Sequence, residues 1–241
     1  SILTTIAILF TLLTETITFF TRVPLSKFFL SGTWNPTGSS PEFGIWALII
    51  GTLKITVIAT IVAVPIGLGA AIYLNEYASD RSRRIIKPIL EILAGIPTIV
   101  FGFFALTFVT PILRNLIPNL GEFNSISPGI VVGIMIVPMI TSMSEDAMSS
   151  VPDKIREGAF GLGATKFEVA TKVVLPAATS GVVASIVLGI SRAIGETMIV
   201  SLAAGSSPTS SLSLTSSIQT MTGYIVEIAT GDAAFGSDIY Y

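Results

Sequence analysis

Long apolar runs alternate with short polar segments along this chain. Five runs are candidates for crossing a bilayer, and they cover about 2–20, 46–73, 88–113, 128–143 and 177–204. About 20 apolar residues in a helix span a hydrocarbon core of about 30 Å, and the fourth run is short by that measure. The pattern predicts an all-α membrane protein, a polytopic helical bundle that forms one domain over residues 1–241. Pro65, the pair Gly95 and Pro97, and Pro138 predict irregular or kinked helices inside three of the runs.

The polar segment 146–176 separates the fourth run from the fifth. Ser150 with Asp153 and Thr165 with Glu168 both fit the S/T-x-x-D/E capping pattern, which satisfies free backbone N–H groups at a helix start. Gly163 falls between the two predicted helices. The segment is therefore predicted to be two short helices bent about a glycine hinge.

Composition narrows the function classes. The chain is 51% hydrophobic and 12% charged, with a mean hydropathy of +0.83. Its net charge of −2 gives no electrostatic case for nucleic acid. It contains no Cys and no His, which removes thiol nucleophiles, imidazole bases and the usual zinc ligands. It also lacks a G-x4-G-K-[ST] loop, so we expect no ATP site, no metal site and no side-chain catalysis in this chain.

Basic residues predict the orientation. Segments 81–87 and 154–172 together hold eight of the 13 Lys and Arg residues, whereas the loops on the opposite side hold Arg22, Lys27 and Arg114. The positive-inside rule therefore makes segment 146–176 cytoplasmic and segment 205–241 extracytoplasmic. Lys54 lies inside the second run, and we expect it to reach the outer interface by snorkelling.

Arg192 and Glu196 bring opposite charges into the fifth run. Arg192 lies 16 residues beyond Pro176, roughly 24 Å along a helix and thus inside the bilayer. The i, i+4 spacing predicts that Glu196 shares its face, so that the two side chains can pair. Such a pair either fixes helix packing or serves function. We favour function, because pairing lowers the cost of burying charge without removing it and apolar residues would pack equally well.

The chemistry of this pair favours an anionic substrate. A guanidinium presents planar, forked donors that match phosphate or sulfate. The partner carboxylate would compete for the Arg and keep the site weak enough to release its cargo. Ser191, Thr197 and Ser201 add hydroxyls at a similar depth.

Threonines form a second candidate feature in the second run. Thr52, Thr56 and Thr60 recur every four residues and share one helix face. The stripe either lines a path or bonds to its own backbone in lipid, and the sequence leaves both readings open.

The polar segment also resembles a known family. Glu157-Gly158-Ala159, then three residues to Gly163, then nine residues to Val173-Val174-Leu175-Pro176, resembles the EAA loop (E-A-A-x3-G-x9-I-x-L-P) of ABC importer permeases. This sequence departs from that pattern at Gly158 and Val173. The resemblance implies a coupling segment that docks into a separate ATPase subunit, with Glu157, Gly158, Ala159, Gly163, Leu175 and Pro176 as its residues.

Three further motifs resemble phosphate-uptake (Pst-type) permeases, and the PstC-type subunit in particular. They are SRAIGET at 191–197, AGIPTIVFGF at 94–103 and PIGLGAAIYLNEYA at 65–78. The resemblance implies a type I, MetI-like permease in a prokaryotic inner membrane, with Arg192, Glu196, Ser191 and Thr197 on the substrate path. Such permeases usually have six spans, so we expect a final helix beyond the five visible ones.

The same resemblance implies the partners. They are a second, PstA-like permease subunit, two ATPase subunits that bind ATP and Mg on the cytoplasmic face, and a phosphate-binding protein outside. The leading hypothesis is a non-catalytic subunit that forms half of a phosphate path. A permease for sulfate or molybdate is the alternative, and an ion-coupled secondary transporter would require an inverted repeat, which is not evident.

Overall fold

The computed structural model describes residues 2–36 and 40–231, and its elements are almost all helical. In chain order they are α1 (Ile2–Arg22), α2 (Leu25–Leu30), β1 (Trp34–Asn35), β2 (Glu42–Phe43), α3 (Trp46–Ile72), the π-helix η1 (Tyr73–Tyr77), α4 (Asp80–Gly95), α5 (Thr98–Phe104), the π-helix η2 (Ala105–Val109), α6 (Thr110–Leu116), α7 (Ile126–Ser149), α8 (Asp153–Gly161), α9 (Lys166–Glu168), the π-helix η3 (Val169–Val174), α10 (Leu175–Ala177), α11 (Thr179–Ile194), α12 (Met198–Ala203) and α13 (Met221–Thr230).

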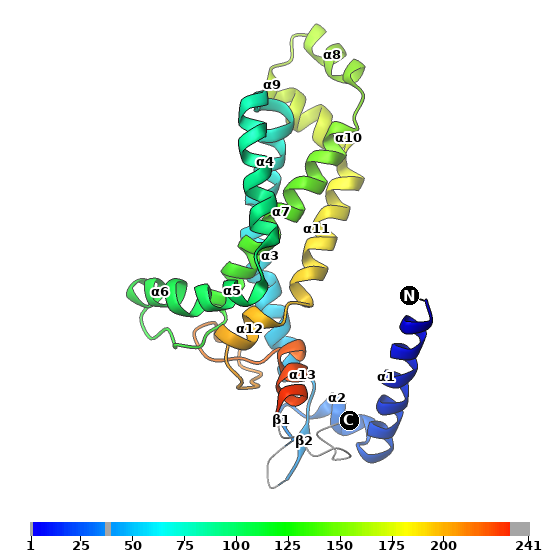
Figure 1. Ribbon diagram of the computed structural model, residues 1–241, viewed down its shortest axis with the longest axis vertical. Coiled ribbons are helices and arrows are strands. Elements are labelled where there is room, and N and C mark those ends of the chain that lie inside the picture. The colour runs from blue at the N-terminus through cyan, green and yellow to red at the C-terminus, as the bar shows by residue number, and fades with distance from the viewer. Residues whose placement is uncertain (1, 37–39, 232–241) are drawn as a thin grey trace.

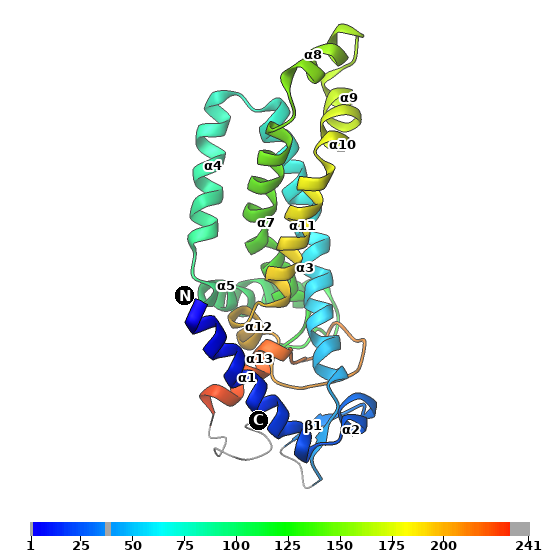
Figure 2. The same ribbon diagram turned by 90° about the vertical axis from the view of Figure 1, so that its right-hand side faces the viewer.

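Four helices define the long axis of the molecule. Helices α3, α4, α7 and α11 lie side by side in both views (Figures 1 and 2). At one end of this bundle α8 and α9 project beyond the other helices, and α12 and α13 lie toward the opposite end. Helices α5 and α6 run across the bundle axis, and α1 stands apart from it.

The lengths and apolar composition of the described helices are those of a protein that spans a membrane several times. Four are long and apolar enough to span a bilayer, namely Ile2–Arg22, Trp46–Tyr77, Thr98–Leu116 and Ile126–Ser149. The pair Lys166–Ala177 and Thr179–Ile194, bent by 76°, makes a fifth span if it is counted as one. The prediction of a helical bundle is confirmed, although three of the predicted spans need correction.

The third predicted span, 88–113, begins in the wrong place. Pro88 lies inside α4, a separate amphipathic helix, and the apolar helix begins only at Thr98. Ile96 between them is extended, with φ −68° and ψ 129°. The ring of Pro97 disfavours helical backbone at the preceding residue, so the chain turns there instead of continuing one long helix.

The fourth and fifth predicted spans also differ from the structure. Helix α7 continues past residue 143 to Ser149, because its last turns are polar but buried. The Ser144 hydroxyl, for example, lies 2.6 Å from the Ser185 hydroxyl of α11. The predicted fifth span, 177–204, is instead broken after Ile194, and α12 begins at Met198.

Small residues bring α3 and α7 into close contact. A Cβ added at Gly67 would lie 2.9 Å from the Ile140 side chain, and one at Gly133 would lie 2.9 Å from the Ala59 carbonyl oxygen. A side chain at either position would therefore push the helices apart. Such small residues are typical of helix interfaces in membranes, where close packing drives association.

The threonine stripe is bonded to its own helix. The hydroxyls of Thr52, Thr56 and Thr60 donate to the carbonyl oxygens four residues earlier, at 2.9, 2.8 and 2.7 Å. Of the two readings left open by the sequence, the structure supports internal hydrogen bonding.

Lys54 reaches toward the segment that is predicted to be extracytoplasmic, and its ammonium bonds to backbone carbonyl oxygens there. Its side chain is buried, and Nζ donates to the carbonyl oxygens of Ser211 and, at 2.8 Å, of Ser213. Lys54 therefore ties segment 205–220 to α3. Ser125 of the neighbouring turn holds the same segment, because its hydroxyl donates to the Leu214 carbonyl at 2.8 Å. The rest of the predicted extracytoplasmic segment, 232–241, lies outside the described residues.

Candidate functional site

The polar segment folds into two short helices, as predicted. Gly163 lies between α8 and α9 with φ +87°, in the left-handed region that favours glycine. Thr165 and Glu168 form the predicted capping box at the start of α9. The other predicted capping box is wrong: the Ser150 hydroxyl donates to the Ala147 carbonyl, and Pro152 precedes α8 without a side-chain cap.

Arg156 fastens α8 to the bundle. Its Nη2 donates to the Met148 carbonyl oxygen at 2.7 Å, in α7, and to Asn75 Oδ1 at 3.1 Å, in η1. Its Nη1 donates to Asp153 Oδ1 at 2.9 Å. Its Nε lies 3.4 Å from Glu76 Oε1 and completes an ion pair without hydrogen-bond geometry. One side chain thus joins the polar segment to the ends of two bundle helices.

The predicted coupling residues are divided between the exposed face of this segment and its buried side. Glu157, Gly158 and Pro176 are exposed, whereas Ala159 and Leu175 pack against the buried cluster around Val169 and Val174. Nothing lies within 4 Å of the position a Cβ would take at Gly158. Four large apolar side chains of the segment are also exposed: Ile155, Phe160, Leu162 and Phe167. These side chains give the segment an apolar surface, and Figure 1 shows that α8 lies at the end of the bundle.

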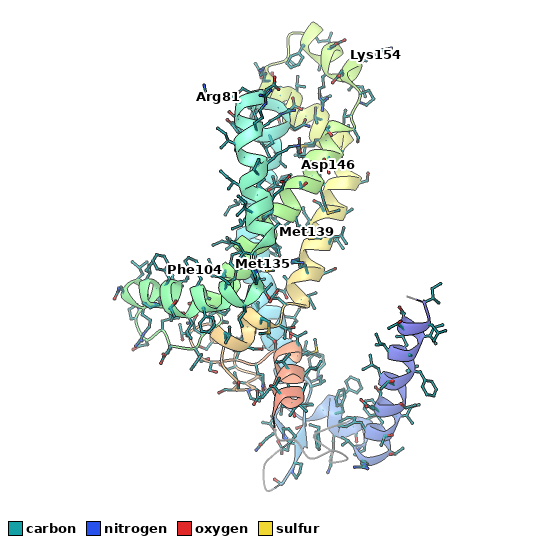
Figure 3. All side chains as sticks on the ribbon, in the orientation of Figure 1. Arg81, Phe104, Met135, Met139, Asp146 and Lys154 are labelled. Carbon is teal, nitrogen blue, oxygen red and sulfur yellow. The ribbon has the colours of Figure 1, made fainter. Side chains whose placement is uncertain are left out.

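A cavity of about 320 Å³ lies among α4, α7 and α11. Its volume falls in the usual range for small-molecule sites, about 300–1,000 Å³. Met135, Met139 and Ser142 of α7 line it, and Figure 3 labels the two methionines on that helix. Its charged lining residues are Lys87 and Glu91 of α4, Glu145 of α7 and Arg192 of α11.

Two of these charges form an ion pair. Lys87 Nζ lies 2.8 Å from Glu145 Oε2, and the side chains are 46% and 6% exposed. The carboxylate is buried in a membrane-spanning helix, where an unpaired charge would be costly. The ion pair therefore stabilises the charged form of the Glu145 side chain, and it connects α4 to α7 at the edge of the cavity.

The predicted pairing of Arg192 with Glu196 is wrong. Helix α11 ends at Ile194 and Gly195 caps it, so the i, i+4 geometry does not extend to Glu196. Glu196 is instead buried, and its Oε1 accepts from the Ile199 backbone N–H at 3.4 Å, at the start of α12. Within the described ranges, no ion pair connects the two residues.

Of the predicted path residues, Arg192 lines the cavity and the others do not. The hydroxyls of Ser191 and Thr197 donate to the carbonyls of Val187, at 2.9 Å, and Gly195, at 3.2 Å. The Ser201 hydroxyl is buried and has no hydrogen-bond partner among the described residues. Within residues 2–36 and 40–231, no group of three His, Cys, Asp or Glu side chains is placed to hold a metal ion.

Sequence reasoning missed Lys87 and Glu145. Lys87 was assigned to a basic loop, and Glu145 fell just outside the predicted fourth span. A signal was nevertheless present, because Met135, Met139, Ser142 and Glu145 repeat at helical spacing on the face of α7 that lines the cavity.

A bundle of membrane-spanning helices with an open cavity lined by charged residues, and a polar helical segment at one end, defines a membrane transport subunit. Residues 63–236 match the family described as binding-protein-dependent transport system inner membrane component, and the chain belongs to this family. It is thus a multi-pass inner-membrane protein.

The chain is similar to curated bacterial permeases. It is 36% identical over 212 residues to the probable ABC transporter permease protein YqgH of Bacillus subtilis, covering 88% of this chain and 68% of that protein. It is 37% identical over 200 residues to the phosphate transport system permease protein PstC of Haemophilus influenzae, covering 75% of this chain and 63% of PstC. The chain thus spans less than two thirds of the PstC length.

Pasteurella multocida PstC is 38% identical over 198 residues, covering 74% of this chain and 61% of that protein. A solved structure of the inward-facing MetNI methionine ABC transporter is 21% identical with a TM-score of 0.49, covering 63% of this chain and 68% of that chain.

Proposed function

We propose that this protein is the permease subunit of an ATP-driven importer and forms half of a translocation path for inorganic phosphate. The observation that carries the proposal is Arg192, whose guanidinium lines a cavity between bundle helices. A guanidinium recognises a tetrahedral oxyanion through forked, charge-assisted hydrogen bonds. The similarity to PstC proteins supports phosphate as the oxyanion.

In this proposal the chain does no chemistry itself. Two ATPase subunits bind ATP and Mg and dock against segment 157–176 on the cytoplasmic face. The exposed apolar side chains of that segment support a protein contact there. The contact residues are those of the predicted coupling motif: Glu157, Gly158, Ala159, Gly163, Leu175 and Pro176.

Two further partners complete the assembly. A second, PstA-like permease subunit supplies the other half of the path, and a phosphate-binding protein delivers the substrate outside. The family description, which specifies binding-protein-dependent transport, supports the second of these. Segment 205–231 is the extracytoplasmic surface that would meet it.

Substrate identity and site are tested together in proteoliposomes. The full-length permease, its partner permease, the ATPase and the binding protein are reconstituted, and labelled phosphate and sulfate are offered in parallel. We expect ATP-dependent uptake of phosphate, and its loss in Arg192→Ala with the complex still assembled. Uptake of sulfate alone would make the alternative, a sulfate or molybdate permease, correct. Uptake without ATP would overturn the coupling role.

A further inference from the structure

The Lys87–Glu145 pair is more than a contact between helices. Both residues line the cavity that Arg192 also lines, so two cations border one open cavity. The pair is asymmetric, because Glu145 is buried in α7 while nearly half of the Lys87 side chain is exposed. The carboxylate is therefore held inside the protein, whereas the Lys87 side chain remains accessible.

Helix packing alone does not account for these residues. The Glu145 side chain is buried while Lys87 is not, so the carboxylate loses most of its hydration for the sake of one half-exposed partner, which makes the pair a weak source of stability. Apolar side chains at 87 and 145 would hold α4 on α7 equally well. Charge at this place in a membrane-spanning bundle instead indicates a function on the path of an ion.

We propose that Lys87 is a second cation that binds the transported oxyanion, and that Glu145 is the carboxylate that pairs with Lys87 while the cavity holds no anion. This inference rests on the proposed phosphate path and assigns two further residues to it. An entering oxyanion accepts hydrogen bonds from Arg192 and from Lys87, and Glu145 loses its partner.

The two cations have different tasks. The planar fork of Arg192 orients the anion, whereas the flexible stem and compact ammonium of Lys87 can turn from a carboxylate to an anion. Glu145 then competes with the anion for Lys87 and keeps the affinity low enough for release, as transport requires. Glu91, one helical turn beyond Lys87 on α4, adds a second carboxylate to the same cavity and acts in the same direction.

The test uses the reconstituted importer and separates binding from packing. Lys87→Met removes the cation but strands the Glu145 carboxylate. The double variant Lys87→Met/Glu145→Met removes both charges and leaves an apolar contact. Arg81→Met is the control, because Arg81 is an exposed cation of the same helix that does not line the cavity; Figure 3 labels it at the end of α4.

We expect the double variant to assemble with its partners and to take up phosphate roughly tenfold more slowly than the wild type, a ratio that corresponds to about 1.4 kcal/mol. The Arg81→Met control should match the wild type. Wild-type uptake by the double variant would overturn the inference while leaving the proposed function intact. Absence of phosphate uptake by the wild-type complex would overturn both.

A second variant tests the competing carboxylate. Glu145→Gln keeps the shape of the side chain and an oxygen that can accept from Lys87, but removes the negative charge. We expect the purified complex of this variant, without binding protein, to retain more labelled phosphate than the wild type and to turn over more slowly. Unchanged retention with unchanged turnover would show that Glu145 does not compete for Lys87.

Discussion

Replacing Arg156 with Met should destabilise the protein measurably. The substitution removes charge-assisted hydrogen bonds to the Met148 carbonyl oxygen and to Asn75 Oδ1, and it leaves Glu76 without its cation. The bond to Asp153 contributes little, because that side chain is 83% exposed. A hydrogen bond to a charged group stabilises a protein by roughly 1.5–3 kcal/mol. Two such bonds at the lower end of that range give a loss of about 3 kcal/mol.

The measurement is the melting temperature of the purified full-length permease. For a chain of this size, each kcal/mol shifts Tm by roughly 2–4 °C, so we expect a decrease of about 6–12 °C. Arg156→Lys should give an intermediate value, because it keeps the charge but loses the forked donors. Lys154→Met is the matched control: Lys154 is exposed on the same helix, and surface substitutions change stability by about 0.5 kcal/mol or less.

A small effect would refute this reasoning. If Arg156→Met melts within about 2 °C of the wild type, a shift that corresponds to less than about 1 kcal/mol, the network around Arg156 does not hold α8 to the bundle. Equal decreases in Arg156→Met and Lys154→Met would instead indicate that the charge of α8 matters and the contacts do not.

Two further substitutions test the ends of the bundle. Gly163→Val places a β-branched residue at φ +87°, which costs about 1–2 kcal/mol of strain. The variant should import less phosphate per ATP hydrolysed. Gly161→Ala is its control, because a Cβ at Gly161 meets open space, and equal ratios of phosphate to ATP in the two variants would exclude a hinge role. Lys54→Met removes the two hydrogen bonds of the Lys54 ammonium to segment 205–220. Limited proteolysis between residues 206 and 216 should therefore become faster in this variant, but not in the control Lys27→Met. Unchanged cleavage in Lys54→Met would mean that Ser125 and its neighbours suffice to hold the segment.

Local sequence patterns predicted the parts of this fold that depend on nearby residues. Apolar run length predicted the helical bundle, and the capping box at Thr165 with the glycine at 163 predicted the bend of the polar segment. These features succeed because their determinants lie within a few residues of one another. The break after Ile194 had a local signal as well, since a basic residue in the last turn, here Arg192, and a glycine just after it, here Gly195, are typical of a helix C-terminus.

The cavity could not be predicted in the same way. Lys87 and Glu145 are 58 positions apart in the sequence, and their contact depends on how α4 packs against α7. Arg156 reaches Asn75 across 81 positions. Neither partner is implied by spacing or composition. The apolar run did not indicate that Glu145 is buried, because α7 extends beyond that run and buries Glu145 in its polar last turns.

The different packing of α3 and α4 has a mechanical consequence. Helices α3 and α7 are in such close contact at Gly67 and Gly133 that a side chain at either position would push them apart. The two helices therefore form a stiff frame. Every residue of α4, all of it within the described ranges, stays at least partly exposed. Besides the bond to Glu145, α4 is anchored at its first turn, where Arg83 donates to the carbonyls of Leu74 and Asn75 at 2.9 Å. Leu93 of α4 also packs against the main buried cluster. Helix α4 is nevertheless held less tightly than α3, so we expect it to be the element that shifts most easily against the frame of α3 and α7.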